Sequence, residues 1–401
     1  MEALFGFSLL ECGVERLKKG GGLPLGGEDR RRLFPVTREG IFLAHAAVAP
    51  ISGPAQQAMG EWGAEAVLGR QEGDEVWRRV KKTREVAARF LGCEWDEVSL
   101  LGPTALGLGL VALGLDWKEG DEVIYDPLDY PANVYPWVDL ARRGVRPVPI
   151  DRCPGKKIRW ETLLPKITNR TKLVTLATAH YLSGLVPDLA VIGPELKARK
   201  ILLCLDGIQT LGVLPTDWAE ADFLAADAHK WMLGPVGAGV FMVRRRVWDR
   251  LSPPLLGSWN VVSPDFLAQA KMVMEEGGRR YEPGSLNLPG IDGMRESLQL
   301  LDRLGRENTS EYVLGLANRI REGAKVGGFS IYGGAEEVRP ITSLREPSGG
   351  WGDGMKRMEA ARIRVSWRRE HEGKMLLRVS PHVSNTVDEV DEFLKVLGRA
   401  G

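Results

Sequence analysis

The chain has 401 residues, of which 44% are hydrophobic and 27% charged, and its 54 Lys and Arg residues nearly balance its 53 Asp and Glu residues. This composition is typical of a soluble globular protein and excludes a disordered chain or a small disulfide-stapled domain. A net charge of +1 gives no long-range field that would attract nucleic acid, so the arginine runs at 30–32 and 244–246 are expected to be solvated faces.

The four cysteines lie far apart, form no CxxC pair and do not cluster with the histidines. We therefore predict neither a disulfide framework nor a metal site. The same cysteine usage fits a reducing compartment, so we predict a cytoplasmic location.

The uncharged stretch 98–115 is long enough to cross a bilayer, but it contains Pro103 and four glycines, so no membrane span is expected. The N-terminus lacks the pattern of an export signal.

The first part of the chain contains an irregular, glycine-rich segment and, further on, a segment with helical periodicity. Residues 20–32 are rich in glycine and charge, which predicts a linker between a short N-terminal helix and the main body. From Asp74 to Leu91 the apolar residues recur at helical spacing between a capping Asp74 and Gly92. This pattern predicts a packed helix.

Six short apolar runs then alternate with helical or polar segments. Because the runs show no alternation of apolar and polar residues, they favour strands buried on both faces of a mostly parallel sheet. The runs are Val98–Leu101, Glu122–Tyr125, Leu173–Ala177, Ile201–Leu205, Phe223–Ala226 and Gly239–Val243. We predict an α/β protein with a large αβα domain at 41–299, and a smaller α+β domain formed by 1–40 and 300–401.

Two charged residues follow buried strands. Ligands of open parallel sheets bind beyond the carboxyl ends of the strands, so residues there are site candidates. Asp206 ends an apolar run, where an ionised carboxylate needs a compensating cation or hydrogen bonds. Lys230 lies beyond the next run, and loss of hydration there would lower the pKa of its amine and make it a nucleophile toward carbonyls. A structural salt bridge between the two is the alternative.

The segment Gly102–Thr104 turns directly into the helical stretch Ala105–Leu115. The free N–H groups and the Thr104 hydroxyl at this turn suit a phosphate, with a purely structural helix cap as the alternative. Tyr130, after the second run, is either a stacking platform for a ligand ring or a packed aromatic.

The sequence GLGLVA at 107–112, followed by Asp126, fits a dinucleotide-binding pattern. Its glycines, however, fall inside the expected helix rather than at its opening turn. A nicotinamide cofactor is therefore disfavoured.

Several segments together resemble a known family. Residues 206–239 (DGIQTLGVLPTDWAEADFLAADAHKWMLGPVGAG) are similar almost end to end to the cofactor signature of the fold-type I pyridoxal-phosphate enzymes of aminotransferase class V. This family includes cysteine desulfurases, kynureninase and isopenicillin N epimerase-like proteins. Matches in the family's order also occur at 41–50, 102–110, 130–137, 279–287 and 376–393.

The resemblance implies pyridoxal 5'-phosphate as cofactor and assigns roles by position. Lys230 matches the lysine that forms a Schiff base with the cofactor, and Asp206 matches the carboxylate that keeps the pyridine nitrogen protonated. The other expected cofactor-binding residues are Thr104 and His229 at the phosphate, Gln209 at the phenolic oxygen, Tyr130 stacked on the ring, Asp227, and Ser285. The expected substrate-binding residues are His45, His180, Tyr181 and the carboxylate-binding Arg378.

Three further expectations follow from the resemblance. Ser285 matches a residue that reaches the phosphate of the neighbouring subunit, which implies a homodimer. Asp227 stands where many relatives have a serine that binds phosphate, so its carboxylate is expected to turn away, to be protonated or to bind another group. The last cysteine is Cys204, so the cysteine that desulfurases carry shortly before the arginine is missing, and persulfide-forming desulfuration is disfavoured.

The expected function is that of a pyridoxal-phosphate enzyme acting on an amino acid, with transamination as the favoured reaction. A lyase or an epimerase is the alternative, and a non-catalytic protein with this fold is a distant one. Neither nucleic acid nor a membrane is an expected partner.

Overall fold

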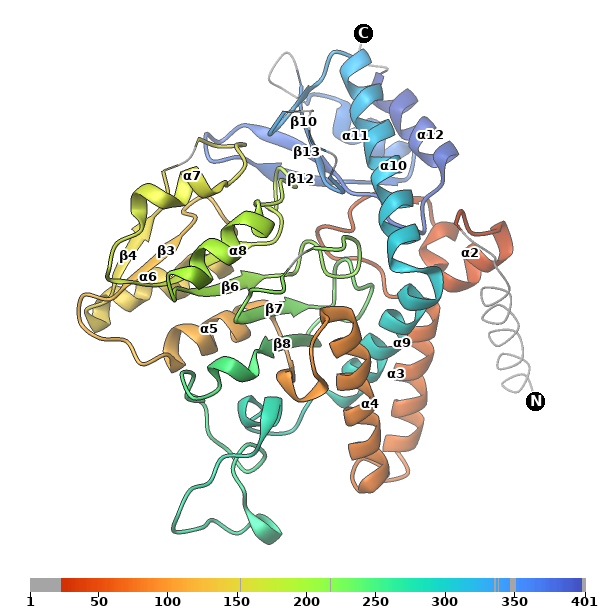
Figure 1. Cartoon of the computed structure of the whole chain (residues 1–401). Coiled ribbons are helices and arrows are strands. Elements are labelled where there is room, and N and C mark those ends of the chain that lie inside the picture. Colours follow the sequence, from red (N-terminus) through yellow and green to blue (C-terminus); the bar gives the residue numbers. More distant parts are fainter. Residues whose placement is uncertain are drawn as a thin grey trace.

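The computed structural model describes residues 23–398 except 152, 217, 335, 336, 338 and 347–350. A central sheet is covered by helices, and a smaller sheet with its own helices lies at one end of the molecule (Figure 1). This arrangement confirms the predicted α/β class with a large αβα layer structure and a smaller α+β part. No described helix combines the length and the apolar character needed to cross a membrane.

The central sheet has seven strands in the order β2-β8-β7-β6-β5-β3-β4. Only β8 runs antiparallel to its neighbours, so the prediction of a mostly parallel sheet is confirmed. The strands are β2 (Val98–Leu101), β3 (Glu122–Tyr125), β4 (Arg146–Pro149), β5 (Thr171–Ala177), β6 (Leu202–Asp206), β7 (Phe223–Asp227) and β8 (Gly239–Val243). The sequence did not predict β4, a half-exposed edge strand whose prolines weaken the strand signal.

The sheet separates two hydrophobic cores. On β6, Leu203 and Leu205 pack into one core, whereas Leu202 and Cys204 pack into the other. This alternation across a pleated strand explains why the predicted runs are apolar throughout: both faces are covered. The helices of this part are α3 (Gly53–Ala66), α4 (Asp74–Leu91), α5 (Thr104–Gly114), α6 (Tyr135–Asp139), α7 (Trp160–Leu163), α8 (Leu189–Ala198) and α9 (Leu288–Leu304).

The C-terminal part forms a four-stranded antiparallel sheet in the order β12-β13-β10-β9, packed on a third core. Its strands are β9 (Ser330–Ile331), β10 (Thr342–Arg345), β12 (Ser366–Arg369) and β13 (Met375–Val379), and its helices are α10 (Arg306–Val326), α11 (Gly354–Ala360) and α12 (Val387–Gly398). The short strand β1 (Ile41–Phe42) pairs with β11 (Ile363–Arg364) in this part. The domain boundaries at 40 and 299 stay predictions.

The predicted linker at 20–32 is wrong over its second half, because Gly27–Leu33 forms helix α2. Glu28 and Asp29 lie in the first turn of α2 and Arg30–Arg32 in the last, which complements the helix dipole at both ends. Leu33 is fully buried, and Arg30 pairs with Glu389 of α12. The glycines before residue 27 disfavour a helix, so the sequence pattern did not indicate α2. The predicted short N-terminal helix lies outside the described residues.

The absence of a side chain at Gly107 lets helix α5 pack closely on the sheet. A β-carbon at Gly107 would lie 2.7 Å from the β-carbon of Ala225 on β7, whereas one at Gly109 would meet nothing within 4 Å. We expect Gly107→Ala to lower the free energy of unfolding by about 1–3 kcal/mol through overpacking. Its matched control, Gly109→Ala, should leave stability unchanged or raise it by up to about 1 kcal/mol, because alanine favours helices. Urea denaturation measures both; equal effects would contradict the packing role.

Candidate functional site

A cavity of about 310 Å³, called here the central cavity, lies beyond the carboxyl ends of the parallel strands. Its walls come from the segments that follow β2, β3, β5, β6 and β7, and from β12 and β13 of the smaller sheet. The lining residues are Ala46, Ala47, Val48, Pro103, Thr104, Ala105, Tyr130, Ala132, Tyr181, Asp206, Ile208, Gln209, His229, Lys230, Arg368 and Arg378. The location agrees with the rule that open α/β sheets bind ligands at this edge.

Lys230 and Asp206 both face this cavity. Asp206 is the last residue of β6, and Lys230 follows the neighbouring strand β7. Burial lowers the pKa of the Lys230 amine to about 8, although the Asp206 carboxylate opposes this shift. Burial likewise raises the pKa of Asp206, whose carboxylate accepts a hydrogen bond of 3.0 Å from the Ile208 N–H. The cavity therefore holds a lysine that is readily deprotonated near neutral pH.

Two tyrosines line the same cavity as the lysine. The Lys230 Nζ atom lies 5.5 Å from the centroid of the Tyr130 ring, which is 50% exposed. The Tyr181 ring meets the Tyr130 ring edge-on, with 5.5 Å between the centroids. An open aromatic face next to an amine can accept a planar ligand.

Thr104 and His229 mark the end of the cavity that suits an anion. Thr104 begins the 11-residue helix α5, and its Oγ1 accepts a hydrogen bond of 3.0 Å from the Asp227 N–H. The helix N-terminus and the threonine hydroxyl favour a phosphate at this point. Gln209 also lines the cavity, and its side chain is held by the Ala46 carbonyl and the Trp231 indole N–H.

Asp227 is turned away from the cavity into its own turn. Its carboxylate accepts hydrogen bonds from the backbone N–H groups of His229 (3.3 Å) and Gly237 (3.4 Å). One carboxylate oxygen also lies 2.8 Å from Nδ1 of His229. These contacts hold the carboxylate within its own turn and beside the histidine that lines the cavity, and the expected cofactor-binding role of Asp227 stays a prediction.

Two arginines come from the smaller sheet. Arg378 on β13 is buried and donates hydrogen bonds to the Tyr181 carbonyl (2.7 Å) and the Ser366 hydroxyl (3.3 Å), while its Nε has no partner among the described residues. Burial and the nearby Arg368 lower the pKa of Arg378 to about 9. Sequence reasoning missed Arg368, which lines the cavity from β12.

Besides Asp227, three expected site residues do not line the cavity. His45 is buried with Nδ1 at 3.1 Å from the Ser380 carbonyl, and burial together with His382 holds its pKa well below the usual value. His180 has Nε2 at 2.8 Å from the Leu128 carbonyl, and Ser285 is exposed on the surface. Their assigned roles stay predictions.

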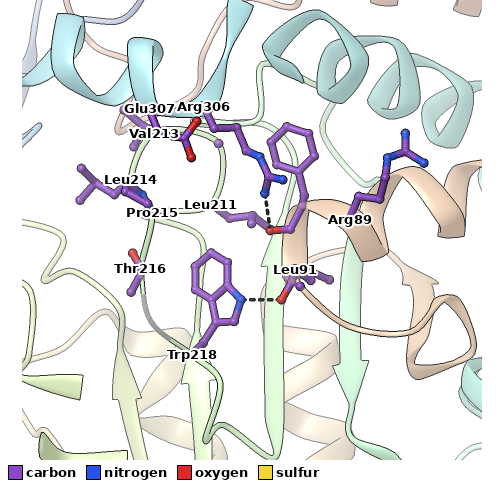
Figure 2. A pocket seen from close by; sticks show the side chains of 13 residues that line it. Arg89, Leu91, Leu211, Val213, Leu214, Pro215, Thr216, Trp218, Arg306 and Glu307 are labelled. Carbon is purple, nitrogen blue, oxygen red and sulfur yellow. Dashed lines mark hydrogen bonds between the residues drawn. The ribbon is translucent and has the colours of Figure 1, made fainter. Parts of the chain in front are cut away.

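A larger cavity of about 380 Å³ lies elsewhere, at the carboxyl end of α4 (Figure 2). Two of its polar side chains are hydrogen-bonded to the end of the helix: the Trp218 indole donates to the Leu91 carbonyl (2.6 Å), and Arg306 donates to the Phe90 carbonyl (3.2 Å). These bonds satisfy carbonyls that the end of a helix leaves without partners. The chemistry-bearing side chains gather in the central cavity instead.

The coupling between Lys230 and Asp206 predicts a pH effect. Asp206→Asn removes an attraction that favours the ammonium, so the pKa of Lys230 should fall from about 8 to below about 7. Because only the free amine reacts with an acylating reagent, labelling of Lys230 in cofactor-free protein should begin at lower pH. Mass spectrometry of the Lys230 peptide measures this midpoint. Asp302→Asn, remote from the cavity, should not move it; an unchanged or raised midpoint in Asp206→Asn would contradict the coupling.

The chain is similar to known proteins in sequence and in fold. A family model described as Aminotransferase class-V matches residues 63–393. A probable cysteine desulfurase of Methanothermobacter thermautotrophicus is 28% identical over 79% of this chain and 80% of its own. Another, of Pyrococcus abyssi, is 26% identical over 92% and 96% of the two chains. The apo structure of a cysteine desulfurase from Thermococcus onnurineus NA1 has the same fold, with a TM-score of 0.84, 24% identity, and coverage of 93% of this chain and 97% of that one.

Proposed function

Because this chain belongs to the aminotransferase class V family, whose enzymes use pyridoxal 5'-phosphate, we propose that it transfers the amino group of an α-amino acid. The observation that carries this proposal is the central cavity, where the Lys230 amine, with a pKa of about 8, lies with Asp206 and Arg378. Such an amine can both take and return a proton near neutral pH.

The residues present fit the cofactor. Thr104, His229 and the free N–H groups of α5 offer donors to its phosphate, and the buried Asp206 offers a carboxylate to its protonated ring nitrogen. Tyr130 presents a ring face for stacking. An ionised carboxylate is costly in this buried position unless a cation lies beside it. The protonated ring nitrogen would be such a cation, which accounts for an aspartate at the end of an apolar strand.

The chain's own groups then position the substrate and move its proton. When bound, the cofactor supplies an electron sink for the bond broken at the α-carbon. Arg378 has a free Nε donor and a guanidinium held by Tyr181 and Ser366, so it can bind the α-carboxylate in a fixed, bidentate geometry. Lys230 can take the proton from the α-carbon, and transamination requires that this proton then be delivered to the bound cofactor rather than back to the α-carbon.

A second candidate is elimination of a β-substituent, which the names of the relatives favour. Both curated relatives reported above are named probable cysteine desulfurase. In this chain none of the described cysteines (Cys93, Cys153 and Cys204) lines the central cavity, and burial raises the pKa of the Cys93 thiol to about 12. An elimination that releases the substituent directly, without a protein persulfide, is therefore the form of this chemistry that fits the site.

A panel of amino acids decides between these reactions. Transamination should yield more than one equivalent of oxo acid per enzyme only when an amino acceptor is present, and it should release no ammonia. Elimination should release the β-substituent, ammonia and an oxo acid without an acceptor. Loss of chirality alone would indicate an epimerase. Lys230→Ala should lower turnover at least about 10²-fold, because it removes the proton carrier. Turnover retained by Lys230→Ala, or no turnover of any amino acid by the intact protein, would contradict the proposal.

We also propose that the active form is a homodimer in which Ser285 reaches the neighbouring cavity. Ser285 is exposed and lies outside the cavity of its own chain. Two apolar side chains that line the cavity are exposed: Val48 is 54% exposed and Tyr130 50%. Such a surface is typical of a protein contact.

Ser285→Ala tests this arrangement. Loss of one hydrogen bond to a charged phosphate should weaken cofactor retention by about tenfold while the protein remains a dimer. Dialysis with absorbance measures retention, and analytical ultracentrifugation measures the mass. Ser330→Ala, an exposed serine of the smaller sheet, serves as the matched control and should retain the cofactor fully. A monomer at assay concentrations would refute the proposal.

A further inference from the structure

Arg368 is placed by strand register beside the carboxylate-binding position. In the antiparallel pair β12–β13, Ser366 lies opposite Arg378, and the two side chains are hydrogen-bonded. Side chains alternate along a strand, so Arg368 shares the face of Ser366, and Arg369 points to the other face. Arg368 and Arg378 are therefore diagonal neighbours, and both line the central cavity.

Arg368 has no anionic partner in the described part of the chain. It is half-buried and donates a hydrogen bond of 2.9 Å to the carbonyl of Trp367, but it forms no ion pair with the described residues. Its charge acts on its neighbours instead: Arg368 contributes to the lowered pKa values of Lys230 and Arg378. A cation kept close to like charges is unfavourable unless a ligand brings an anion to it.

The charges of the cavity do not balance without such a ligand group. Lys230, Arg368 and Arg378 line it, whereas Asp206 is its one lining carboxylate among the described residues. In the proposed function, Asp206 serves the ring nitrogen and Arg378 the substrate α-carboxylate, while the phosphate lies at Thr104. This assignment gives the guanidinium of Arg368 no anionic partner, although it lies on the substrate side of the cavity beside Arg378.

We infer that Arg368 is a specificity residue that binds a second anionic group of the substrate. The substrates are accordingly amino acids with an acidic side chain in addition to the α-carboxylate. A guanidinium suits this task because it stays charged and offers two parallel N–H donors to a carboxylate. This inference rests on the proposed function, and it names the substrate class of that same site.

The test uses two isosteric pairs of probes on the intact holoenzyme: L-aspartate with L-asparagine, and L-glutamate with L-glutamine. Binding is followed by the visible absorbance of the cofactor. In the wild-type protein the acidic member of at least one pair should bind about 10- to 100-fold more tightly than its amide, the range of a charge-assisted hydrogen-bonded pair. Arg368→Gln should abolish this preference and leave the affinity for the amides unchanged.

Two further variants make the result specific. Arg369→Gln, the next residue on the opposite face of the strand, should keep the full preference. Arg378→Gln should weaken binding of acids and amides alike, because both carry the α-carboxylate. Arg368→Lys should recover part of the preference, since it restores the charge without the paired donors.

Each contrary result has its own meaning. If no amino acid changes the absorbance, the proposed function fails. If amino acids bind but the wild type shows no preference for acids, or the preference survives Arg368→Gln, the inference about Arg368 fails while the proposed function stands. If Arg368→Gln loses the cofactor, the guanidinium serves the cofactor phosphate, and the inference is again overturned.

Discussion

The burial of a lysine amine beside a carboxylate, at the ends of two adjacent parallel strands, is the constraint on which the site depends. Asp206 is the last residue of β6 and pairs in register with Ala225 of β7, and Lys230 follows β7 within a few residues. Neither charge would be tolerated alone in this position. Burial lowers the pKa of the amine to about 8 while the carboxylate limits this fall, and the carboxylate stays available to a ligand.

The remaining elements close the cavity around this pair. The N-terminal loop is joined to the other walls by its backbone: the Ala46 N–H donates to the Ser380 hydroxyl (2.9 Å), and the Ala49 N–H donates to the His229 carbonyl (2.8 Å). The smaller sheet adds the arginines of β12 and β13 on the opposite side. Segments from both ends of the chain thus meet at the edge of the central sheet (Figure 1), so the site forms only when the two parts are packed together.

Features set by local sequence could be predicted, and features set by distant contacts could not. The buried strands were predicted from continuous apolar runs and the helix at 74–91 from apolar residues at helical spacing, although the residue that caps this helix is Gly73 and not the predicted Asp74. The arginine runs were expected to be solvated, yet Arg244 pairs with Glu97 and Arg246 with Asp222. In the same way, nothing in the sequence distinguishes Arg368 from Arg369; only the pairing with β13 shows which one faces the cavity. His45 directly precedes Ala46, which lines the cavity, but its ring contacts the backbone instead: Nδ1 lies 3.1 Å from the carbonyl of Ser380, the residue after β13.

The central claim is that the Lys230 amine, among all the amines of the chain, carries the cofactor. Borohydride reduction of the holoenzyme, followed by proteolysis and mass spectrometry of the peptides, tests this claim most directly. We predict that the mass of the reduced cofactor is found on the peptide that contains Lys230 and disappears in Lys230→Ala. Attachment at a different lysine, or no attachment at all, would contradict the account.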